Sequence, residues 1–138
     1  MTHQLAIVVA LAVALHGNDP TDAGAIARAV LSGQWPAQVL DVRVDRAGAH
    51  AVAGLMLSGV KLKRRVGPAA FLADANRMID VALSAAPVEE VDLWVVVPRA
   101  PGVLDTVFTL TVRRGASNRH PYWDPRWRAG LAPPAANR

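Results

Sequence analysis

The alternation of apolar and polar residues predicts both helices and strands over residues 19–114. The stretch Asp19-Pro20-Thr21-Asp22 combines capping residues, a first-turn proline and acids near the positive end of a helix dipole. A short helix is therefore predicted over 23–31, ended by Ser32-Gly33. From Gln38 the period changes to two, which predicts a first strand in which Leu40, Val42 and Val44 share the buried face.

The remaining elements follow from the same reasoning. Residues 51–62 predict a second, longer strand, with Gly54 and Gly59 as candidate bulges. Apolar residues at three- and four-residue spacing predict a helix over 68–86, opened by Gly67-Pro68 and ended at Pro87. Two further strands are predicted over 91–97 and 106–114. The segment Pro98–Asp105 between them is predicted to be too long for a tight hairpin turn.

The predicted order is α-β-β-α-β-β, which indicates an α+β domain over residues 18–114. Because hairpin-like strand pairs alternate with helices, we expect a two-layer sandwich with a mostly antiparallel four-stranded sheet and two helices on one face. Residues 115–138 show neither period and are predicted to form an irregular aromatic and basic tail. Its residues Tyr122, Trp123 and Trp127 are expected to pack back onto the domain, with Trp127 the better candidate for an exposed contact.

The apolar run Leu5–Leu15 decides the compartment in which the chain is interpreted. As a helix it spans about 16 Å, against a bilayer core of roughly 30 Å. This length suits the apolar region of a secretory signal peptide over residues 1–17, with Ala12-Val13-Ala14 as a cleavage site, although no Lys or Arg precedes it. The alternative is a buried element of a cytoplasmic domain. No transmembrane helix is predicted, and a periplasmic or secreted location is expected.

Composition narrows the chemistry that the chain can carry. The 138 residues contain no cysteine, which excludes disulfides, thiolate metal sites and a cysteine nucleophile. With 52% hydrophobic and 19% charged residues, the chain is typical of a globular protein.

Positive charge is concentrated in two stretches, and the net charge is +4 at pH 7. A run of four basic residues ends the second predicted strand, and the region from Arg99 onward is also rich in arginine. Segregated charge attracts anionic partners, although a basic strand end also serves simply to discourage aggregation. If the strand ends are adjacent, the candidate anion- or partner-binding residues are Lys61, Lys63, Arg64, Arg65, Arg113, Arg114, Arg126, Trp127 and Arg128.

No catalytic, metal or cofactor site is predicted. The four histidines are not spaced as metal ligands and no glycine-rich phosphate loop is present. The acids Glu89, Glu90 and Asp92 before the third strand are expected to be solvated surface.

These observations favour an exported, non-enzymatic accessory or binding domain of the cell envelope. Its basic and aromatic surface would contact a protein or an anionic polymer. A cytoplasmic nucleic-acid-binding domain that uses the same cationic surface is the alternative, because arginines beside aromatic rings also suit single-stranded nucleic acid.

Overall fold

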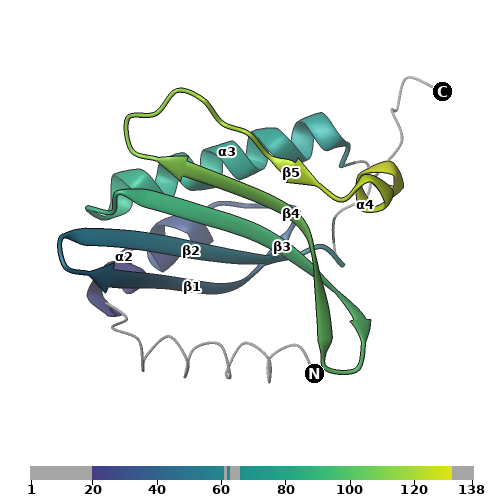
Figure 1. Cartoon of the computed structure of the whole chain (residues 1–138), viewed down its shortest axis with the longest axis horizontal. Helices are drawn as coiled ribbons and strands as arrows, with labels where there is room; N and C mark the ends of the chain where they lie inside the picture. Colours follow the sequence, from purple (N-terminus) through teal and green to yellow (C-terminus); the bar gives the residue numbers. More distant parts are fainter. Residues whose placement is uncertain (1–19, 61, 63–65, 132–138) are drawn as a thin grey trace.

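The computed structural model describes residues 20–60, 62 and 66–131 of the chain as one mixed sheet with helices (Figure 1). The elements are α2 (Pro20–Leu31), β1 (Gln38–Ala47), β2 (His50–Ser58), α3 (Pro68–Ala85), β3 (Glu90–Ala100), β4 (Val103–Arg113), β5 (Tyr122–Trp123) and α4 (Pro125–Gly130). The predicted signal segment lies outside these residues. No helix in the described part of the chain is long and apolar enough to cross a membrane.

The α+β class is confirmed, but the expected four-stranded, mostly antiparallel sandwich is wrong in its details. The sheet has five strands in the order β1-β2-β3-β4-β5, and β2 and β3 are parallel. The reason is the connection through α3, which is long enough to return the chain so that β3 runs in the same direction as β2. Three helices are present in the described region instead of two.

Several boundaries also differ from those predicted. The second strand ends at Ser58, although it was expected to reach Leu62. The segment 98–105 is no loop: β3 continues to Ala100, β4 begins at Val103, and Pro101-Gly102 alone forms the turn. Gly102 adopts a positive φ of 75°, a conformation that a tight turn needs and glycine supplies readily.

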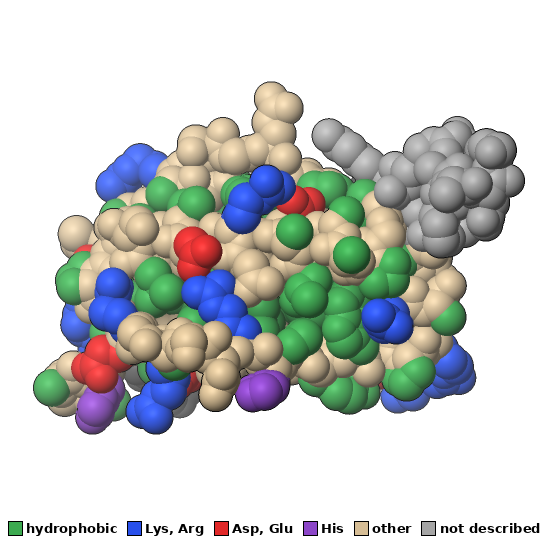
Figure 2. All heavy atoms as spheres, turned by 90° about the horizontal axis from the view of Figure 1, so that it is seen from above, with side chains coloured by type: hydrophobic (Ala, Val, Ile, Leu, Met, Phe, Trp, Pro, Cys, Tyr) green, Lys and Arg blue, Asp and Glu red, His purple; other side chains and the backbone are tan. Residues whose placement is uncertain are grey.

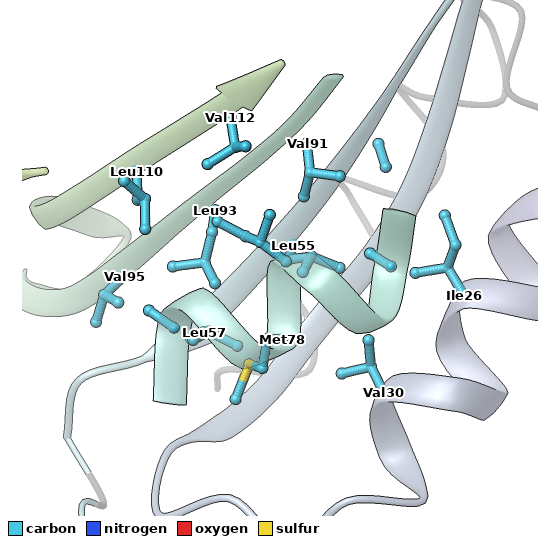
Figure 3. Packing of buried hydrophobic residues seen from close by; sticks show 14 of the residues in the cluster. Ile26, Val30, Leu55, Leu57, Met78, Val91, Leu93, Val95, Leu110 and Val112 are labelled. Atoms are coloured by element: carbon cyan, nitrogen blue, oxygen red, sulfur yellow. The ribbon is translucent and has the colours of Figure 1, made fainter. Parts of the chain in front are cut away.

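The hydrophobic core lies between the sheet and the two longer helices (Figure 3). In Figure 1 both α2 and α3 lie behind the strands. Alternate strand residues such as Leu55, Leu93 and Leu110 point to this side and are at most 1% exposed. They meet Ile26 of α2 and Met78 of α3, so the strand and helix periods were predicted correctly where they build the core.

Candidate functional site

The tail is more ordered than the sequence indicated, because it adds a strand to the sheet. Tyr122 and Trp123 pair with Thr109 and Phe108 of β4. Alternation along β5 turns Trp123 toward the core, where its ring lies 4.7 Å from that of Phe108, and leaves Tyr122 54% exposed. Residues 122–130 are therefore part of the fold, and the prediction of an irregular tail is wrong for this segment.

The short helix α4 follows from a local capping pattern. The Asp124 carboxylate accepts hydrogen bonds from the backbone N–H groups of Arg126 (2.9 Å) and Trp127 (3.1 Å). Pro125 occupies the first turn, where its missing N–H costs nothing. The N–H of Asp124 donates to the Val107 carbonyl at 2.8 Å, so the start of the helix is tied to β4.

Trp127 fixes α4 to the domain. Its ring stacks near Trp123 at 6.1 Å and meets Phe71 of α3 edge-on at 5.4 Å. Gly59 lies directly against it: a Cβ there would come within 3.1 Å of the indole nitrogen and 2.8 Å of Val97. Trp127 is thus a half-buried anchor, and the expectation that it is free for an exposed contact is wrong.

The two arginines of α4 lie on its exposed side. Neither Arg126 nor Arg128 forms an ion pair within the described residues, whereas Arg99 and Arg119 each have a carboxylate partner. The Arg128 guanidinium lies 5.3 Å from the centre of the Trp123 ring, a cation–π distance. We call Arg126, Trp127 and Arg128 the α4 surface: two cations on a short helix that half-buried aromatic rings anchor to the domain.

The structure places Arg113 far from the end of the strand that precedes the predicted basic run. Arg113 pairs across the sheet with Glu90, which faces Val52 near the start of β2, whereas Ser58 at the end of β2 faces Val96. At about 3.3 Å per residue these two positions are roughly 20 Å apart. Ser58 precedes the basic run, whose Lys61, Lys63, Arg64 and Arg65 lie outside the described residues.

Two described residues, one before the basic run and one inside it, show which part of the domain the chain lies next to at that point. Gly59, two residues before Lys61, contacts Trp127. Leu62, inside the run, packs against the core. The chain therefore enters the basic run beside α4 and not beside Arg113.

Arg113 and Arg114 already interact with other groups of the chain. Arg113 lies 3.8 Å from the Glu90 carboxylate. Arg114 donates to the carbonyls of Leu83 (2.7 Å) and Ala86 (3.1 Å) at the end of α3, which lack helical partners, and to the carbonyl of Val88 (2.8 Å) in the segment that follows. These bonds line a depression of about 460 Å³ at the end of α3. Arg114 is thus placed to stabilise a helix end.

Basic side chains are dispersed over the molecule and do not form one block. Figure 2, which views the side of α3 and α4, shows basic side chains as separate groups, some of them beside acidic side chains. The α4 surface differs from Arg99, Arg113 and Arg119 in that neither of its arginine side chains forms an ion pair within the described region.

Sequence reasoning missed a second group of residues, on the side of the sheet away from α2 and α3. The Arg43 guanidinium lies 5.3 Å from the centre of the Trp94 ring, above Gly54, with Asp41 on the same strand face. Burial raises the pKa of Asp41, an effect that Arg43 partly opposes. The alternation of polar and apolar residues in β1 indicated a polar face that includes Asp41 and Arg43. Trp94, however, appeared in the sequence only as one member of an apolar run.

Glu90 belongs to the same side of the sheet. The neighbouring Asp92 carboxyl, within hydrogen-bonding reach, raises the pKa of Glu90, and Arg113 partly offsets this. The acids expected to be simple solvated surface thus include two that interact closely. Residues 20–60, 62 and 66–131 hold no group of three acidic or histidine side chains that could bind a metal ion.

Comparisons with known proteins add no family to this geometry. No protein-family model, curated protein or solved structure matches the chain.

Proposed function

We propose that the protein is an exported, non-enzymatic binding domain of the cell envelope, which contacts an anionic polymer or an acidic protein surface through the α4 surface. The observation that carries the proposal is that Arg126 and Arg128 form no ion pair in the described part and lie on a helix anchored by half-buried aromatic rings. Ordering a tail in this way fixes two cations in a defined place, which reduces the entropic cost of binding.

The aromatic packing favours this partner class over nucleic acid. Single-stranded nucleic acid binds by stacking bases on accessible rings. The rings of Trp123 and Trp127 instead pack against Phe71, Phe108 and each other. Arginines on a rigid helix suit carboxylate, sulfate or phosphate groups instead, through forked hydrogen bonds.

Retention on immobilised heparin tests the proposal. The double variant Arg126→Gln/Arg128→Gln should elute at clearly lower salt than the parent chain, because retention depends on the cations that contact the polyanion. The matched control is Arg28→Gln/Arg99→Gln, which removes the same charge from α2 and the end of β3. Equal shifts for both variants would show that net charge alone is responsible and would refute the α4 surface.

The expected contribution of the basic run is tested separately. We propose that Lys61 and Arg64 add to the same surface, because Gly59, two residues before Lys61, lies against Trp127. Lys61→Glu/Arg64→Glu should then lower retention further. Compartment is tested by the intact mass of the protein purified from its native source. Loss of residues 1 to about 14–17 would support export, and a retained N-terminus would contradict it.

A further inference from the structure

The side of the sheet opposite α2 and α3 forms a regular polar lattice. In Figure 1 no labelled helix lies in front of this side. Because side chains alternate along each strand, every second residue belongs to it. The register aligns three rows across β1, β2, β3 and β4: Asp41–Met56–Trp94–Thr109, Arg43–Gly54–Asp92–Thr111 and Asp45–Val52–Glu90–Arg113. We call these residues the polar face.

The polar face is acidic although the chain as a whole is basic. Its carboxylates outnumber its cations, and Arg43 and Arg113 are the only bases in the three rows. Arg113 lies within 4 Å of one acid, Glu90. Arg43 lies over the Trp94 ring. Local negative potential therefore persists on this side of a molecule with net charge +4.

Three carboxylates of the polar face are incompletely satisfied. One oxygen on each of Asp41, Asp45 and Asp92 is buried and has no hydrogen-bond partner. Such atoms are uncommon in folded proteins because they lose their hydration without compensation. These three oxygens are themselves closed to solvent, so a docked partner would compensate the charge of the carboxylates without bonding to these atoms.

Trp94 gives the polar face an apolar centre. Gly54 leaves room for the ring, since a Cβ at that position would lie 3.1 Å from the indole carbon Cζ3. Arg43 already uses the ring as a guanidinium platform. The ring is therefore engaged within the chain, and the carboxylates around it are the groups that a guanidinium or ammonium group of a partner would meet.

We propose that the polar face docks a basic, Lys- and Arg-rich segment of a partner protein. Alternate side chains of an extended segment recur about every 6.6 Å, which equals the separation of successive rows on a strand. An extended segment running along the strands can therefore place one cation opposite each row. An anionic polymer is disfavoured here by the sign of the charge, so this surface and the α4 surface would bind different partners.

The test is the binding of a fluorescently labelled Arg-Gly repeat peptide of about ten residues, followed by anisotropy with the full chain. The variant Asp45→Asn/Asp92→Asn should weaken binding at least about tenfold, because it removes two of the carboxylates that would pair with the guanidinium groups of the peptide. Binding should also weaken as salt rises. An acidic peptide of equal length should not bind.

The matched control removes two acids elsewhere. Glu89→Gln/Asp105→Asn alters two exposed surface ion pairs and should change the affinity less than twofold. Circular dichroism and thermal melting confirm that both variants fold. If the two variants weaken binding equally, or the parent chain does not bind the peptide, the proposal is overturned.

Two reciprocal measurements separate this proposal from the previous one. Arg126→Gln/Arg128→Gln should leave peptide binding intact, and Asp45→Asn/Asp92→Asn should leave heparin retention intact. Sedimentation of the parent chain tests a second copy as the occupant. Self-association that the polar-face variant abolishes would assign the surface to that contact and overturn the assignment to a basic partner segment.

Discussion

Arg114 lies against the end of α3, whereas Arg126 and Arg128 lie on α4. All three are exposed arginines, but their surroundings differ. The Arg114 guanidinium donates hydrogen bonds to three backbone carbonyls. Arg126 and Arg128 have no such acceptors in the described residues, and the anchoring there is done by Trp127. The comparison teaches that the role of a surface cation depends on which acceptors the fold already provides.

The α4 end of the molecule and the end of α3 are also stabilised by different forces. The α4 end depends on aromatic packing, which contributes through buried area and ring geometry. The end of α3 depends on hydrogen bonds that a single guanidinium donates. Substitutions at the two ends should therefore change the stability by different amounts, and conservative replacements should restore it to different extents.

The largest effect is expected at Phe108, which is fully buried and lies beneath Trp123. Phe108→Ala should cost about 3–5 kcal/mol, because it removes a ring and leaves a cavity under the β5 strand. Thr109→Ala, on the opposite side of β4, should cost well under about 1 kcal/mol. Equal costs in a denaturant titration would contradict the strand assignment.

The next effect tests the anchor of the α4 end. Trp127→Ala should lower the stability by about 2–3 kcal/mol, less than for a fully buried ring because the indole is half-buried. This reverses the expectation from the sequence, which treated Trp127 as free for contact. Trp127→Phe should recover much of the loss in a thermal melt, and a melting temperature unchanged by the alanine variant would contradict the packing.

What the sequence predicted, and what it did not, follows from the range of the forces involved. The helix at α3 and the alternation in β4 are local periodic patterns that encode buried faces, and both were recovered. The parallel pairing of β2 with β3 depends on contacts between distant segments. The order of residues 122–130 depends on where Phe71 and Phe108 lie in space, and nothing near Trp123 in the sequence shows this.

The candidate site divides in the same way. Arg126, Trp127 and Arg128 were identified from composition, but the sequence could not show that Arg114 is used by carbonyls of α3. The strand ends that would have united the basic residues lie about 20 Å apart, since β4 runs antiparallel to β3. The polar face needed the register of β1, β2 and β3, which no single strand reveals.

A smaller effect is expected at the end of α3. Arg114→Ala should cost about 1–2 kcal/mol, since its hydrogen bonds are partly replaced by water at an exposed site. Arg114→Lys should not restore the loss, because an ammonium cannot reproduce the planar fork. Arg126→Ala should change stability by less than about 0.5 kcal/mol. Equal losses for Arg114→Ala and Arg126→Ala in urea unfolding would remove the distinction between the two ends.

The smallest effect, and the one with a defined pH dependence, concerns Asp41 on the polar face. Burial raises its pKa above the ordinary value of 3.8, so the folded state holds a proton that the unfolded state has lost. Stability therefore falls as pH rises from the ordinary value through the raised one, and the ionised carboxylate is a cost at pH 7. Asp41→Asn should raise the melting temperature at pH 7 by no more than a few degrees, and this gain should disappear as the pH falls below 3.8. Asp105→Asn, at an exposed ion pair, is the control and should change little at pH 7. A gain for Asp41→Asn that is the same at both pH values would show that shape, and not the buried charge, is responsible.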